Sequence, residues 1–309
     1  MKELRLGLIG AGPWGRSYIK TIAGIPGLKL ARVASRNPET RKLVPEGCEV
    51  TEHWHAVCES IDLDGVIIAS PPHTHAEFVG ACLNRGLPTL VEKPLTLDAA
   101  EAKGLLALAR AKHGFVLVDH IYLFHNAYLE LKNRARGLGV PQLISAAGGN
   151  KGPFRENALP LWDYGPHDLA MCLDFLGERP ESIEAKFRPQ DKGQLIDIRL
   201  KFSGGLQARL CVGNGMQKRE RNFCVRWRDQ ALTLDDAGPR ALVLSKLDMY
   251  GKPKDQGEEI KVDKTPPLTR AVEAFAKAIR AKSTDLSSLE LGVAIVEILA
   301  RCEEMRGEK

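Results

Sequence analysis

Apolar runs alternate with stretches of helical spacing through the first 120 residues of the chain. Runs such as 65–69 (GVIIA) contain no polar position, which is typical of strands buried on both faces of a parallel sheet. The alternation predicts an α/β Rossmann fold, a doubly wound parallel sheet with right-handed crossovers. The expected strands are 4–9, 28–34, 49–51, 65–69, 89–91 and 115–118, and the expected helices are 15–23, 39–43, 54–60, 75–85 and 99–112.

The pattern changes after residue 121, where strand-like segments follow one another with turn signals between them. Strands in succession without intervening helices indicate an α+β domain with an open, mostly antiparallel sheet. We therefore expect two domains, 1–121 and 122–309. The second should hold strands at 142–147, 182–187, 195–202, 206–212, 222–227, 231–234 and 241–244, helices at 126–136, 166–175, 268–281 and 289–305, and a loop at 252–267.

Residues 10–15 read GAGPWG between the first expected strand and helix. Gly10 permits a tight turn, Gly12 lets the backbone approach phosphates, and Gly15 lets the helix pack close to the strand. Pro13 suits the first helical turn, where its missing N–H breaks no hydrogen bond. This strand–turn–helix predicts a site for a dinucleotide pyrophosphate at the helix N-terminus.

The tip of the second strand indicates which nucleotide binds. An acidic residue there would bond a ribose 2′-hydroxyl and repel a 2′-phosphate, but this chain has Ser35 and Arg36. Arg36 can pair with phosphate or stack on adenine, and Arg41 is a second candidate contact. We expect NADP(H), with NAD(H) possible, and the missing acid disfavours an adenosylmethionine-dependent methyltransferase. A helix start with Asn37 as its N-cap is compatible with either cofactor.

Two further segments carry candidate chemistry. Lys93 follows the strand at 89–91 and should lie at the carboxyl edge of the sheet, where a lysine can donate to a substrate oxygen; it could also be an ordinary surface lysine. Asp163 and His167 are four residues apart around Gly165 and Pro166, where we expect a helix to begin. They could share a proton-transfer role, or be a helix cap and a core histidine.

Four motifs together resemble the Gfo/Idh/MocA oxidoreductases: GAGPWG at 10–15, SPPHTH at 70–75, EKP at 92–94 and DYGPHD at 163–168. The resemblance runs nearly from end to end and includes the two-domain pattern. It implies that the catalytic residues are Lys93, Asp163 and His167. In that family the lysine contacts substrate and nicotinamide, often before a cis proline; the histidine donates or accepts the proton, and the aspartate orients the substrate.

The resemblance also implies that Ser70, Pro71 and His75 form a loop beneath the cofactor. Leu123 stands where many members carry an arginine, and for His120 both a site-lining and a structural role stay open. The residues expected to bind the cofactor are Gly10, Gly12, Pro13, Trp14, Gly15, Ser35, Arg36, Ser70, Pro71, His75, Glu92 and Lys93.

Composition narrows the function classes. The net charge of +5 is spread along the chain, and the basic segment 218–228 alternates like a solvated strand face, so we expect no nucleic-acid partner. No apolar run is long enough to span a bilayer, and no signal peptide precedes the first strand. Seven cysteines without a CxxC spacing indicate a reducing compartment, and we expect a cytoplasmic protein. His53/His55 and His73/His75 lack further ligands, so no metal is expected.

The sequence therefore predicts an NADP-dependent oxidoreductase acting on a CH–OH or carbonyl group of a sugar, polyol or sugar derivative. Alternatives are a non-catalytic sensor of NADP and sugar, or a reductase of a dihydrodiol or a bilin. An open sheet with one bare face predicts a homodimer or homotetramer.

Overall fold

The computed structural model describes residues 2–154 and 159–307, which fold into two compact units. Unit 1 consists of Met1–Ile121 with Pro266–Val296, and unit 2 of Tyr122–Thr265 with Glu297–Lys309. The chain first leaves unit 1 after Ile121. Residues 266–296, which the sequence pattern assigned to the second domain, pack with unit 1.

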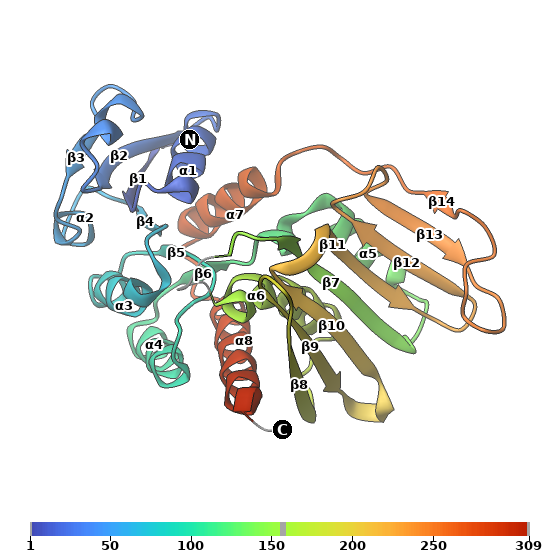
Figure 1. The fold of residues 1–309 in the computed structure, drawn as a ribbon. Coiled ribbons are helices and arrows are strands. Elements are labelled where there is room, and N and C mark those ends of the chain that lie inside the picture. Colours follow the sequence, from blue (N-terminus) through green and yellow to red (C-terminus); the bar gives the residue numbers. More distant parts are fainter. Residues whose placement is uncertain (1, 155–158, 308–309) are drawn as a thin grey trace. The chain divides into compact units, whose positions relative to one another are not determined.

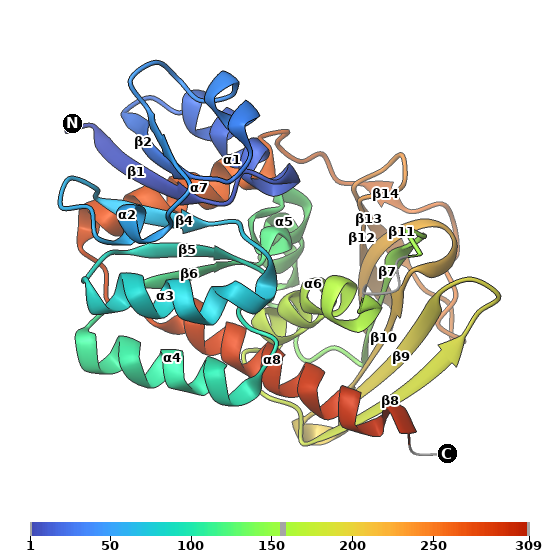
Figure 2. The same cartoon turned by 60° about the vertical axis from the view of Figure 1, so that its left-hand side comes forward.

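Unit 1 contains a six-stranded, wholly parallel sheet with the order β3-β2-β1-β4-β5-β6. Helices cover both of its faces, with α1 against α7 on one and α3 against α4 on the other (Figure 2). The predicted doubly wound fold is confirmed. Its elements are β1 (Leu4–Ile9), α1 (Pro13–Ala23), β2 (Leu28–Ala34), β3 (Glu49–Thr51), α2 (His55–Cys58), β4 (Gly65–Ile68), α3 (His75–Asn84), β5 (Thr89–Glu92), α4 (Ala99–Lys112), β6 (Val116–Asp119) and α7 (Pro267–Ala281).

The core of unit 1 follows from the apolar pattern. All of β4 is buried, as its continuous apolar run predicts. Tyr18, Ile19 and Ile22 recur at helical spacing and form the buried face of α1. Phe275 of α7 joins them in the same apolar cluster. Burying these side chains stabilises the layer by about 1.5–3 kcal/mol for each large apolar group.

Unit 2 contains an eight-stranded sheet with the order β14-β13-β12-β11-β7-β10-β9-β8 (Figure 1). Every neighbouring pair is antiparallel except β7 and β10, which run parallel. The predicted open, mostly antiparallel sheet is confirmed. Its elements are α5 (Asn126–Ala135), β7 (Leu143–Lys151), α6 (Pro160–Leu176), β8 (Ser182–Pro189), β9 (Gln194–Lys201), β10 (Gln207–Gly213), β11 (Gly215–Arg226), β12 (Gln230–Asp235), β13 (Leu242–Lys246) and β14 (Glu258–Glu259).

Helices α5 and α6 cover one face of this sheet. Residues 221, 223 and 225 of β11 pair in register with 148, 146 and 144 of β7, and all six are buried on that face. The alternating residues point to the opposite face, where Cys224 pairs with Ser145 and Thr233 on its two neighbouring strands. Neither α5 nor α6 covers this second face, and its side chains are half-buried in unit 2.

Helix α6 differs from its prediction. It begins at Pro160 rather than at Pro166, so Pro166 lies inside the helix. Pro160 supplies the favourable first-turn proline, and the buried residues Leu161, Trp162 and Tyr164 anchor the first turns. Tertiary packing outweighs the local cost of Gly165 and Pro166.

Smaller corrections concern the loops and the last helix. The expected helix at 39–43 is a 3₁₀ helix, Pro38–Lys42, and the expected loop at 252–267 contains β14. The last helix, α8 (Ser287–Glu304), begins in unit 1 and ends in unit 2. Among the described residues, no helix is both long and apolar enough to cross a membrane.

Candidate active site

The glycine turn of unit 1 has the geometry of a phosphate cradle. Gly10 adopts a φ of +97°, and a Cβ there would lie 2.6 Å from the carbonyl oxygen of Ala69. A Cβ on Gly15 would lie 2.0 Å from the carbonyl oxygen of Gly10, so only glycine permits this approach of helix and strand. A Cβ on Gly12 would meet nothing within 4 Å, and no side chain caps α1. The turn therefore fits a pyrophosphate bound by backbone N–H groups, with Pro13 in the first helical turn and Trp14 half-exposed beside it.

The tip of β2 presents Ser35 and Arg36. The Ser35 hydroxyl lies 2.8 Å from the hydroxyl of Thr40 and accepts a hydrogen bond from the backbone N–H of Asn37. Asn37 caps the following 3₁₀ helix, as predicted. Arg36 is exposed, whereas Arg41 donates to the carbonyl oxygen of Val50. A fixed hydroxyl and an exposed guanidinium thus stand together at the position that discriminates between nucleotides.

The loop after β4 is tied to the segment after β5 by one buried histidine. The ring nitrogens of His75 lie 2.8 Å from the carbonyl oxygen of Pro94 and 3.0 Å from that of Ser70. Burial lowers the pKa of His75, and the two carbonyl groups oppose that shift. His75 therefore joins two segments of unit 1. Pro71 of the same loop is exposed, and the role of the loop beneath the cofactor stays a prediction.

Lys93 follows β5 at the carboxyl edge of the sheet and is half-buried. Its peptide bond to Pro94 is cis, which confirms the bond that the resemblance implied. The ring of His120 is completely buried after β6, and burial together with the Lys93 charge lowers its pKa to about 3. Glu92, Lys93 and His120 therefore form one electrostatic group in unit 1, in which His120 is neutral.

In unit 2, α6 carries both Asp163 and His167. A spacing of four residues places them on the same helical face, one turn apart. Asp163 is exposed, whereas His167 is buried with 9% of its surface accessible. The prediction that the pair spans the turn at the start of the helix is wrong. The two residues still lie on one helical face, because four residues make about one helical turn.

Tyr122 fixes the surroundings of His167. The His167 ring meets the Tyr122 ring edge-on, with centroids 5.2 Å apart. The Tyr122 hydroxyl donates to Asp236 over 2.9 Å, and the ring of His125 stacks on Tyr122 at 5.9 Å. His125 and Asp236 also form an ion pair at 3.4 Å when His125 is protonated. Sequence reasoning did not assign these contacts, and the two that involve Asp236 join segments more than 100 residues apart.

Arg221 is a second residue that the sequence interpretation missed. It belongs to the segment interpreted as a solvated strand face, yet it is buried, with its guanidinium carbon 5.2 Å from the centre of the Tyr122 ring. Its Nη1 lies 3.5 Å from Oδ1 of Asp168, the residue after His167. The alternation of β11 turns Arg221 toward α6, where the buried Asp168 requires a cation. The sequence did contain a signal for this pair, because Arg221 and Asp168 each occupy a position on the apolar face of their strand or helix.

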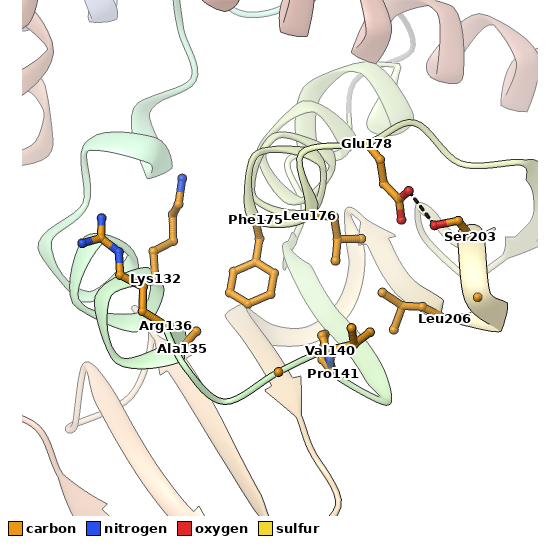
Figure 3. Close-up of a pocket in the computed structure, with 12 residues that line it drawn as sticks. Lys132, Ala135, Arg136, Val140, Pro141, Phe175, Leu176, Glu178, Ser203 and Leu206 are labelled. Atoms are coloured by element: carbon orange, nitrogen blue, oxygen red, sulfur yellow. Dashed lines mark hydrogen bonds between the residues drawn. The ribbon is translucent and has the colours of Figure 1, made fainter.

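Two hollows of unit 2 contain neither Asp163 nor His167. The larger, of about 710 Å³, lies between the end of α5, the end of α6 and the turn after β9 (Figure 3). Its apolar floor includes Phe175 and Leu206, and Lys132 at its rim is paired with Asp174. Residues 155–158, in the segment between β7 and α6, lie outside the described residues. Among those described, no group of three or more metal-binding side chains occurs.

The structure thus gathers the expected cofactor residues in unit 1 and the expected proton-transfer pair in unit 2. Within each unit the neighbours of these residues are defined. The meeting of Lys93 with Asp163 and His167 stays a prediction of the sequence.

Comparisons with known proteins agree with both units. Residues 4–120 match the GFO_IDH_MocA model, described as an oxidoreductase family with an NAD-binding Rossmann fold. The chain is 33% identical over 303 residues to dTDP-3,4-didehydro-2,6-dideoxy-α-D-glucose 3-reductase of Streptomyces violaceoruber, covering 91% of this chain and 86% of that one. It is 26% identical over 294 residues to UDP-N-acetylglucosamine 3-dehydrogenase of Acidithiobacillus ferrooxidans, covering 91% and 90%.

A solved structure is similar over the whole length. The crystal structure of an oxidoreductase from Magnetospirillum magnetotacticum has 40% identity and a TM-score of 0.91, covering 97% of this chain and all of that one. The similarity therefore extends through unit 2 as well as through the Rossmann sheet.

Proposed function

Because this chain belongs to the Gfo/Idh/MocA family of oxidoreductases, we propose that it transfers a hydride between NADP(H) and a carbinol or carbonyl carbon of a sugar derivative. The observation that carries the proposal is the His167 ring, held beside Tyr122 on a helix that also presents Asp163. An imidazole can accept a proton on one ring nitrogen and return it in the reverse reaction.

The proposed chemistry divides between cofactor and protein. The nicotinamide, when bound, supplies or accepts the hydride. His167 accepts the hydroxyl proton when a carbinol is oxidised and returns it when a carbonyl is reduced. Lys93 donates a hydrogen bond to the same substrate oxygen, and Asp163 orients the neighbouring hydroxyl groups. This assignment requires Lys93 and His167 to reach one substrate from the two units.

The residues of unit 1 support NADP(H) over NAD(H). Ser35 offers a hydroxyl and Arg36 an exposed guanidinium at the tip of β2. A 2′-phosphate would be bound by both, whereas a ribose 2′-hydroxyl has no carboxylate to bond at this tip.

The names of two relatives narrow the proposed substrate. One is a 3-reductase of a dTDP-linked sugar and the other a 3-dehydrogenase of UDP-N-acetylglucosamine. We therefore place nucleotide-linked sugars first among candidate substrates, ahead of free sugars and polyols.

A substrate panel tests the proposal. UDP- and dTDP-linked hexoses and their keto forms, free sugars, inositols, a dihydrodiol and a bilin are each mixed with NADP⁺ or NADPH, and the absorbance of NADPH is followed in both directions. Turnover of a sugar derivative that His167→Ala removes supports the proposal. Tight NADPH binding without turnover of any member favours the sensor, and turnover of a dihydrodiol or a bilin alone favours the other alternative.

We further propose that the chain forms a homo-oligomer through the second face of the eight-stranded sheet. Its centre holds the small side chains Ser145, Cys224 and Thr233, which could pack closely against a second copy. Light scattering coupled to gel filtration should give a dimer or tetramer for the native chain. Cys224→Arg should shift it toward the monomer, whereas Glu273→Arg, on the exposed side of α7, should not. A monomeric native chain contradicts the proposal.

A further inference from the structure

Three buried polar side chains meet at the carboxyl edge of the sheet in unit 1. Glu92 ends β5 and Asp119 ends β6, and the two pair directly in register. Tyr18 reaches them from α1: its hydroxyl oxygen lies 3.2 Å from Oε1 of Glu92 and also hydrogen-bonds Oδ2 of Asp119. The exposed fractions are 0% for Tyr18, 7% for Glu92 and 1% for Asp119. We call these three residues the acid cluster.

The hydrogen bonds of the acid cluster require a shared proton. A phenol has one hydrogen, so Tyr18 can donate to only one of the two carboxyl groups. The second contact is a hydrogen bond only if that carboxyl group is protonated and donates to the phenol oxygen. If both groups were ionised, two buried carboxylates would face each other around a single donor, which is costly at this degree of burial.

The environment indicates which group holds the proton. Burial, and then the charge of Asp119, raise the pKa of Glu92 to about 8. Burial raises the pKa of Asp119 to about 6, and the hydrogen bond from Tyr18 opposes that rise. At neutral pH, Glu92 is therefore the acid that donates to Tyr18, and Asp119 is the carboxylate that accepts from it.

Lys93 is the cation that acts on this cluster. Its charge lowers the pKa of Glu92 and also that of His120, which stays neutral. The interaction is reciprocal, because an ionised Glu92 must attract the ammonium group as strongly as the ammonium favours its ionisation. A protonated Glu92 exerts no such attraction.

We propose that the acid cluster holds one proton so that Glu92 acts as a positioning residue for Lys93. Protonated Glu92 leaves the ammonium group to the substrate oxygen, and ionised Glu92 draws it back toward the sheet. The inference rests on the proposed function, because it takes Lys93 as the residue that binds this oxygen. The titratable groups that act on Glu92 are Tyr18 from α1, Asp119 from β6 and its neighbour Lys93.

Kinetics give the first test, through two nearly isosteric variants with opposite effects. The native enzyme should lose kcat/KM as pH rises through about 8. Glu92→Gln cannot ionise and should lack this alkaline limb. Asp119→Asn removes the charge that resists ionisation and should move the limb down by about one pH unit or more. A purely structural role would lower activity without moving the limb in opposite directions.

Spectroscopy gives the second test, in the cofactor-free protein. With ¹³C-labelled glutamate carboxyl groups, NMR should show one carboxyl that is protonated at pH 7 and titrates near pH 8. The signal should be absent in Glu92→Gln, and should titrate at higher pH in Lys93→Met, which loses the nearby cation. Glu77→Gln, exposed on α3, is the matched control and should leave this signal in place.

The two tests separate this inference from the proposed function. An ionised Glu92 at pH 7 overturns the inference even if the enzyme turns over a sugar derivative. A titration near pH 8 without turnover of any substrate leaves the shared proton in place and refutes the role of Lys93 instead. If Glu92→Gln does not fold, the native and Lys93→Met titrations still test the assignment of the signal. A carboxyl signal whose pKa does not change in Lys93→Met does not belong to Glu92.

Discussion

Each unit buries one aspartate beside a residue with a proposed role in the reaction. The two units stabilise the buried carboxyl group in different ways. Asp119 of unit 1 and Asp168 of unit 2 are completely buried, and burial raises the pKa of each to about 6. Asp119 accepts a hydrogen bond from a neutral phenol and faces a second acid. Asp168 faces the guanidinium of Arg221, which opposes the rise of its pKa.

The difference separates a charge that can change from one that is fixed. The carboxyl groups near Lys93 can gain or lose a proton close to neutral pH. Arginine does not lose its proton in proteins, so Arg221 stays a cation beside Asp168. Unit 1 therefore balances its buried aspartate with a proton that can be lost near neutral pH, while unit 2 balances its own with a cation that keeps its charge.

The largest expected effect is catalytic and tests whether both units contribute to the chemistry. We expect His167→Ala to lower kcat by about 10²–10⁴-fold, the usual contribution of a general acid or base. Lys93→Ala should also lower turnover strongly. NADPH binding, followed by fluorescence titration, should change little in either variant. Loss of cofactor binding with unchanged turnover of the remaining complex would contradict both roles.

The next effect tests the fixed charge in unit 2. Arg221→Met leaves Asp168 buried without its cation, and breaking a buried pair in this way lowers the free energy of unfolding by about 3–5 kcal/mol. The double variant Arg221→Met/Asp168→Asn should recover part of the loss. Urea denaturation measures both, with Arg209→Met, at an exposed position of β10, as the control. Equal stability of Arg221→Met and this control would show that the pair does not matter.

A smaller effect is expected for the cofactor preference of unit 1. Hydrogen bonds to a charged group contribute about 1.5–3 kcal/mol. The double change Ser35→Asp/Arg36→Ile should therefore shift the ratio of kcat/KM for NADPH over NADH by about 10- to 100-fold toward NADH. Steady-state kinetics with the two cofactors measure this ratio. An unchanged ratio would remove the 2′-phosphate assignment from the tip of β2.

The smallest effect should come from the phenol of unit 1. Tyr18→Phe removes a single neutral donor from the acid cluster, so we expect the free energy of unfolding to fall by about 1 kcal/mol. The loss should be clearly smaller than for Arg221→Met in the same denaturation experiment. A loss as large as that of Arg221→Met would mean that the two units compensate for their acids in the same way.

Local pattern predicted much of unit 1. The strands β1 and β2 and the helix α4 have the expected bounds, because buried apolar runs and a capping Asp98 carry the information locally. The glycine turn was equally readable, because its three glycines lie within six residues, and Gly10 and Gly15 lack the space for a Cβ.

Non-local packing explains what the sequence did not predict in unit 2. Gly165 and Pro166 indicated a helix start, but the buried residues before them extend α6 to Pro160. The parallel pairing of β7 with β10 joins strands far apart in the chain, and no local turn signals it. The burial of Arg221 was not predicted for the same reason, since its partner Asp168 belongs to α6 rather than to its own strand.

The late position of helix α7 in the chain affects how the protein folds during synthesis on the ribosome. Val272, Phe275 and Ala276 complete the apolar layer of unit 1, yet they are translated after nearly all of unit 2. The nascent Rossmann sheet must therefore wait with part of its apolar surface uncovered until the last helices emerge from the exit tunnel. Unit 1 is therefore begun first but is completed only after residues 122–265 of unit 2 have been made.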